Sequence, residues 1–205
     1  MFQLAMNIEE NKETKMKIRT DYVSNSSSSS FIIIANSGTD RTLDIKSDFL
    51  SYKEDWTSYP IPNTIGKHEF GWEWEDTNSF KGKLNFVGIQ LLYLFIEKIS
   101  NEECEYKRPY TGKDFDRLYD MLKKVCKERF GFSVRLNPDI INTEIGFSED
   151  RGGYYGFTTL ATGFYIDHQS ASSEGSCMEM FESEDALYNF LRFDESYIRG
   201  GNDNG

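Results

Sequence analysis

A run of five serines, Ser26–Ser30, constrains the N-terminal half of this chain more than any other sequence feature. The run follows Asn25 and lies between two segments with β-branched and aromatic residues, 17–23 and 31–35. Such residues fit a pleated, half-buried surface, whereas serine side chains compete for backbone hydrogen bonds and favour turns. The pattern therefore predicts two neighbouring β-elements joined by a hydroxyl-rich loop.

Two interpretations of this loop remain open. A low-complexity serine segment is typical of a flexible polar connector. Alternatively, clustered hydroxyl and backbone N–H groups can hold a phosphate or another anion. The chain has no Gly-Lys-Ser/Thr sequence at this point, so a P-loop is not predicted. We expect the run to serve folding or docking rather than bond-making.

Three segments are predicted to be helices, because their apolar residues recur at helical spacing. Asn78 or Ser79 can cap the first helix, Gly131 follows the second, and Ser183 can cap the third. The first carries apolar residues on most sides and should be a central helix. The predicted helices span residues 80–100, 114–130 and 184–192.

Strands are predicted where apolar or aromatic residues form short runs or alternate with polar ones. Pro60 and Pro62 predict an irregular loop over residues 56–64. The fold class that follows is α+β, with a mainly antiparallel sheet and with two longer helices and one short C-terminal helix on one side. The predicted strands are 31–35, 70–75, 132–136 and 164–167.

Length and composition predict a folded chain of one domain or two small ones. The 205 residues include 15% aromatic residues, far more than a disordered chain would carry. We expect residues 16–199 to form one α+β domain, residues 1–15 to be a polar extension, and residues 200–205 to be a flexible tail.

Charge and cysteine content limit the classes of partner. The formal net charge is −11, without a basic patch, so direct nucleic-acid binding is not expected. An acidic chain stays soluble, and it can also dock onto a basic surface. Three widely spaced cysteines favour reduced thiols in a cytoplasm. No apolar stretch is long enough to span a membrane.

Candidate chemistry centres on His168, at the end of a predicted strand and beside a second serine-rich stretch. If the fold brings the two serine stretches together, a serine such as Ser28 could act as a nucleophile with His168 as its base. The neighbouring Asp167 would point to the opposite face of a strand, so it is not the expected partner. The candidate binding residues are Asn25, Ser26, Ser27, Ser28, Ser29, Ser30, Asp167, His168, Gln169 and Ser170.

A metal site or a cofactor is not expected. His68, Glu69, Asp167 and His168 are suitable ligand types, but their spacing matches no His-x-x-x-His or His-Glu-x-x-His pattern. The simpler interpretation of these histidines is that they form hydrogen bonds within loops.

Several segments resemble a group of proteins from tailed phages and Gram-positive bacteria. The resemblance covers the opening, residues 17–31, with its serine run, and three later stretches: Phe70-Gly71-Trp72-Glu73, Ile166-Asp167-His168-Gln169-Ser170 and the end of the chain from Ser196 to Asn204. It implies a phage or mobile-element setting and no particular activity. The resemblance also implies Met16 as an alternative start of translation, because chains of that group often begin near this segment.

We therefore expect a phage-type accessory protein without catalysis in the host bacterial cytoplasm. It would act by binding a protein, and it would inhibit or redirect a host or defence factor. One alternative is a protein that binds a small ligand or nucleotide, or a hydrolase, using the serine-rich loops and His168. Another alternative is a minor component of the virion.

Overall fold

The computed structural model describes residues 31–42, 58–61, 69–70, 77–100, 109–137, 165–166 and 178–199. These residues form helices and short strands, so the mixed α+β class is confirmed. Predicted features in the other residues lie outside the described part of the chain. These features are the polar extension, the five-serine run and the C-terminal tail.

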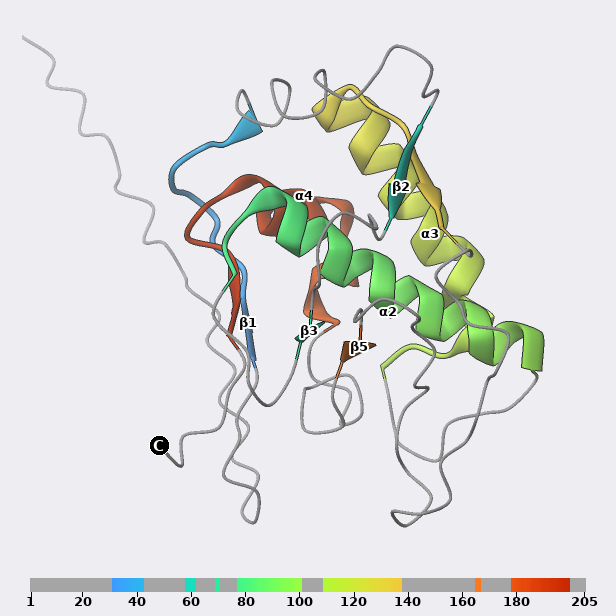
Figure 1. Ribbon diagram of the computed structural model, residues 1–205. Helices are drawn as coiled ribbons and strands as arrows, with labels where there is room; N and C mark the ends of the chain where they lie inside the picture. Colours follow the sequence, from blue (N-terminus) through green and yellow to red (C-terminus); the bar gives the residue numbers. More distant parts are fainter. Residues whose placement is uncertain are drawn as a thin grey trace, which may run out of the picture.

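The central element is α2, Phe80–Ser100, which crosses the middle of the molecule in Figure 1. Its bounds match the sequence prediction. The N–H of Gly82 donates to Oγ of Ser79, which confirms one of the two expected caps. Almost every side chain from Phe80 to Glu97 is buried, because apolar residues occur on all sides of this helix.

A second helical segment packs against α2. It begins with a 3-10 turn, η1 (Gly112–Asp114), continues as α3 (Phe115–Val125), and ends in a π-helical turn, η2 (Cys126–Phe130). The predicted apolar face is buried. Gly131 has a positive φ of 83° and ends the helix, as its position in the sequence predicts.

The third helix, α4 (Glu184–Arg192), follows the 3-10 turn η5 (Glu179–Phe181) and packs against both longer helices. Oγ of Ser183 accepts a hydrogen bond from the N–H of Ala186, which confirms the expected N-cap. Leu187, Phe190 and Leu191 are buried, which agrees with the helical spacing of apolar residues in this segment. Ala186, on the same helix, is half-buried.

The described strands form three pairs. The first strand, β1 (Phe31–Ile33), pairs antiparallel with the last, β6 (Tyr197–Arg199), with Ile32 opposite Ile198. The other two pairs are parallel: β2 (Tyr59–Ile61) with β4 (Val134–Leu136), and β3 (Glu69–Phe70) with β5 (Tyr165–Ile166). The described residues therefore do not show the mainly antiparallel sheet that the sequence predicts.

Strand β2 also corrects the loop expected over residues 56–64. Pro60 lies within this strand and is opposite Arg135 of β4. The pairing uses the N–H of Tyr59, which donates to the carbonyl of Ser133, and the carbonyl of Ile61, which accepts from the N–H of Asn137. Because these bonds come from the residues on either side, the proline position does not need an N–H toward β4.

Candidate functional site

The candidate site is centred on Lys83, a buried lysine in the first turn of α2. The residue is 1% exposed. Its Nζ donates to the carbonyl oxygen of Phe193 at 2.6 Å and to that of Ser196 at 2.9 Å, and it lies 5.8 Å from the ring centre of Phe190. A buried amine is costly unless its N–H groups are hydrogen-bonded, so these two carbonyls allow Lys83 to occupy the core.

Both carbonyls belong to the turn that joins α4 to β6, residues 193–196. Phe193 ends α4, and its N–H donates to the carbonyl of Asn189. The fully buried Ser196 donates its hydroxyl to that same carbonyl and accepts the N–H of Ala35, in each case at 2.9 Å. The turn is thus tied to α2, to α4 and to the chain that follows β1.

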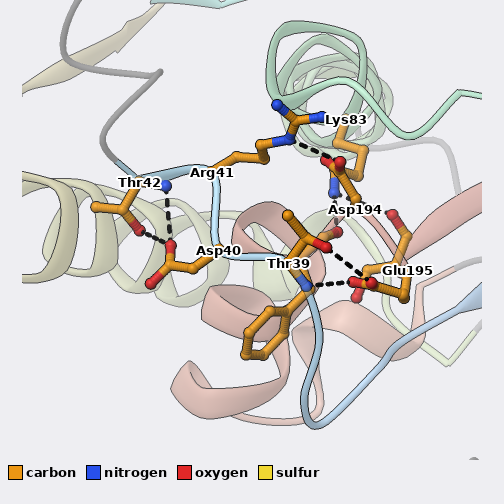
Figure 2. A network of polar contacts seen from close by, with 9 residues as sticks. Thr39, Asp40, Arg41, Thr42, Lys83, Asp194 and Glu195 are labelled. Carbon is orange, nitrogen blue, oxygen red and sulfur yellow. Dashed lines mark hydrogen bonds and ion pairs between the residues drawn. The ribbon is translucent and has the colours of Figure 1, made fainter.

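The acidic side chains of this turn hold the segment after β1 (Figure 2). Nε of Arg41 donates to Asp194 at 2.6 Å, and the backbone N–H and hydroxyl of Thr39 donate to Glu195 at 2.8 and 3.1 Å. Gly38 has a φ of 153°, and a Cβ at this position would overlap the carboxylate of Glu195. The contact therefore needs a glycine at position 38.

Asp40 connects the same segment to α4. Its carboxylate accepts from Nη2 of Arg192 at 2.6 Å and from the N–H and hydroxyl of Thr42. The hydrogen bond from Arg192, assisted by those from Thr42, outweighs partial burial and lowers the pKa of Asp40 to about 2. Asp40 is therefore ionised at any pH near neutrality.

The electrostatics of Lys83 differ from those of an ordinary lysine. Burial lowers the pKa of its amine to about 7, and the charges of Asp194 and Glu195 act in the opposite direction. A neutral lysine amine can act as a nucleophile or a base. Here the amine is enclosed and holds two backbone carbonyls, and that arrangement fits fixing the turn better than attacking a substrate.

A second polar feature lies where α3 and α4 meet, at the surface. We call it the α3–α4 row, and it consists of ion pairs and of cations lying over tyrosine rings. Lys124 pairs with Glu184 at 2.7 Å, and Arg129 pairs with Asp185 at 3.1 Å. Its members are Tyr110, Arg117, Lys124, Arg129, Glu184, Asp185, Tyr188 and Arg192.

Each tyrosine of the α3–α4 row is half-buried and lies beneath a guanidinium group. Arg117 lies 5.5 Å from the ring centre of Tyr110. Arg129 and Arg192 lie 5.2 and 5.1 Å from that of Tyr188. Since Arg192 also binds Asp40, the row continues into the contacts around the α4–β6 turn.

The residues that the sequence predicts as a binding or catalytic site lie outside the described residues. Whether the two serine-rich stretches meet is therefore still a prediction. The same applies to His68 as a metal ligand. The predicted site residues concerned are Asn25, Ser26, Ser27, Ser28, Ser29, Ser30, Asp167, His168, Gln169 and Ser170.

The described residues hold no group of three or more His, Cys, Asp or Glu side chains that could bind a metal ion. Cys126 is fully buried, and burial raises the pKa of its thiol, so it has the character of an unreactive core residue. Nor does any helix in the described ranges have the length and apolar character needed to cross a membrane.

Sequence reasoning did not single out Lys83. A signal was present, because Phe80 and Val87 lie three residues before and four residues after it, on the same face of the helix. A lysine between two apolar residues of a buried stripe must either reach the surface or find acceptors in the core. The first of its acceptors lies 110 residues later in the chain. Helical periodicity does not predict which distant segment will pack against the helix.

Comparison of the chain with protein-family models, with curated protein sequences and with solved structures finds no match.

Proposed function

We propose that this chain is a phage-type accessory protein of the host cytoplasm that acts by binding another protein, and that binding inhibits or redirects a host or defence factor. The observation that carries the proposal is the α3–α4 row. It places arginine and tyrosine side chains together at the surface. These residue types, with tryptophan, are enriched among the residues that dominate protein–protein binding energy.

The geometry of the row suits reversible docking. The side chains of Arg117, Arg129 and Arg192 are 55%, 45% and 30% exposed, so they remain accessible while they cover the tyrosine rings. Exposed ion pairs contribute only about 0 to 1 kcal/mol each. Arg117 pairs with Asp114 at 3.0 Å, as Arg129 pairs with Asp185. A partner carboxylate can therefore replace either aspartate at little cost, while the rings supply apolar area.

The distribution of charge supports a partner with a mixed or basic surface. The described residues carry 13 basic and 13 acidic side chains, so the net charge of −11 comes from the remaining residues. The row itself has four cationic and two acidic side chains, so it would contact acidic groups of the partner. The acidic remainder would attract a basic partner over a longer range.

The test begins with capture of partners from host lysate at moderate salt, followed by titration of the purified partner. In the double variant Arg117→Ala/Arg129→Ala, we expect affinity to fall at least tenfold, because hot-spot arginines typically contribute more than about 1.4 kcal/mol. The matched control is Lys98→Ala/Arg135→Ala, which removes the same charge outside the row and should change affinity less than twofold.

Two results would contradict the proposal. The first is a chain that captures no specific partner and turns over a substrate instead. The second is an equal loss of affinity in both double variants, because net charge rather than the row would then explain binding. Thermal unfolding of both variants confirms that they are folded, since exposed substitutions of this kind change stability by about 0.5 kcal/mol or less.

A further inference from the structure

We propose that Lys83 is a proton-sensitive latch on the C-terminal strand: its neutral amine keeps the α4–β6 turn closed, and its protonation favours opening of that turn. The inference concerns a conformational device in the core and does not depend on the proposed partner binding.

The first support is the match between donors and acceptors. A neutral lysine amine has two N–H groups, and the described residues offer Nζ two acceptors, the carbonyls of Phe193 and Ser196. An ammonium has a third N–H and a full charge inside a site that is 1% exposed. The enclosure therefore satisfies the neutral amine more completely than the ammonium.

The groups near the amine are two carboxylates and one aromatic ring. Asp194 and Glu195, in the turn itself, attract the ammonium. Asp194 is also bound to Arg41, while Glu195 is held by Thr39. From α4, the neighbour is the ring of Phe190. Both carboxylates already bind other groups, so their attraction for the ammonium does not compensate for the hydration that it loses on burial. The pKa of Lys83 therefore remains near 7.

Opening the turn would release the end of the chain. Beyond Ser196, strand β6 pairs with β1, and Ile198 exchanges backbone hydrogen bonds with Thr77, with both N···O distances at 3.0 Å. The same turn holds Ala35 and Thr39. Because these contacts converge on residues 193–198, one opening event would loosen the segments on both sides of β6.

The direction of the pH dependence follows from linkage. The pKa of Lys83 is about 7 in the closed turn and near its ordinary value of 10.5 when the amine is hydrated. The open form therefore binds the proton more tightly, and a low pH favours it. Stability of the closed turn rises with pH from about 7 upward, and the open population falls about fiftyfold between pH 7 and pH 9.

Two measurements on the full-length chain test this inference. Nitrogen-detected NMR of labelled lysine should show that Nζ of Lys83 titrates near neutrality. Amide hydrogen exchange, corrected for the intrinsic rate, should show the protection of Ile198 rising about fiftyfold from pH 7 to pH 9. A Lys83 that titrates above pH 10, or a protection factor that is constant over this range, would overturn the proposal.

Variants separate the latch from general effects of pH. Lys83→Arg carries a permanent charge and Lys83→Met carries none, so in both variants the protection of Ile198 should lose its dependence on pH between 7 and 9. The control Lys98→Met removes an exposed lysine of the same helix and should retain the wild-type dependence. If the Lys83 variants do not fold, the two wild-type measurements still decide the question.

Discussion

At the scale of single residues, two glycines illustrate two different reasons for lacking a side chain. Gly131 adopts a positive φ of 83° beyond the π-helical turn, and a Cβ there would meet no atom within 4 Å. Gly112 instead lies against the last turns of α2. A Cβ at Gly112 would come within 2.5 Å of the backbone nitrogen of Lys98. The positive φ therefore favours glycine at position 131, whereas the close approach of two backbones requires glycine at position 112.

We predict that asparagine is worse than alanine at one of these two positions and better than alanine at the other. At Gly112, alanine should lower the free energy of unfolding by about 1 to 3 kcal/mol, and the larger asparagine should lower it further, because backbone atoms cannot move aside. At Gly131, asparagine should be better tolerated than alanine, because it adopts the left-handed conformation more readily. Urea denaturation of the four variants measures both differences. An asparagine at Gly112 that is milder than alanine would contradict the steric explanation.

The buried lysine is also a residue-scale feature. Lys83 is one of several polar side chains buried along α2, with Gln90 and Glu97 following at seven-residue intervals on nearly the same face. Such groups cost stability unless they find partners, so each one fixes its surroundings. In the case of Lys83 the partner is the α4–β6 turn, which lies far away in the sequence.

At the scale of elements, α4 shows how local signals define a short helix. Ser183 caps its first turn, the acidic Glu184 and Asp185 follow, and Arg192 lies in the last turn. Acidic residues near the start and a basic residue near the end interact favourably with the helix dipole and so stabilise the helix. The sequence predicts the bounds of this helix correctly, because all these signals lie within ten residues.

We predict that Ser183→Ala lowers the free energy of unfolding by about 0.5 to 2 kcal/mol, since it removes the side-chain acceptor for the N–H of Ala186. Ser183→Asp is the matched comparison, because it keeps an acceptor and should stay near the wild-type value. Thermal and urea unfolding measure the two. Equal losses in the two variants would show that the cap does not contribute to the stability of α4.

Strand β2 shows where element prediction fails. Two prolines near each other favour a loop, yet Pro60 lies in a strand that pairs with β4. The decisive fact is that the neighbouring residues Tyr59 and Ile61 carry the hydrogen bonds. This depends on which way the strand faces its partner, and no local pattern encodes that orientation.

At the scale of the whole molecule, one hydrophobic core joins both ends of the described chain. It extends from Ile32 of β1 through α2 and α3 to Ile198 of β6. Phe80, at the start of α2, packs edge-on against Phe130 and Phe132, with ring centres 5.2 and 5.9 Å apart. The centre of this core, formed by α2 and the helical segment of residues 115–130, should open as a unit rather than piece by piece.

Cys126 provides a probe of that unit, because it is fully buried within the core. In a variant with Cys104→Ser and Cys177→Ser, we predict that Cys126 reacts with a thiol reagent only upon global unfolding. The labelling rate should therefore follow the denaturant dependence of unfolding measured by circular dichroism. Rapid labelling of the folded variant in the absence of denaturant would contradict this view of the core.

The sequence by itself determined the mixed α+β class, the three helices and their caps, because helical spacing, capping residues and terminal glycines act within a few residues of one another. Only the tertiary structure decided the direction of strand pairing and the role of Pro60. It also decided that Lys83 meets a turn more than a hundred residues away. These features depend on contacts between distant segments, and a lysine or a proline has the same local pattern whichever partner the fold supplies.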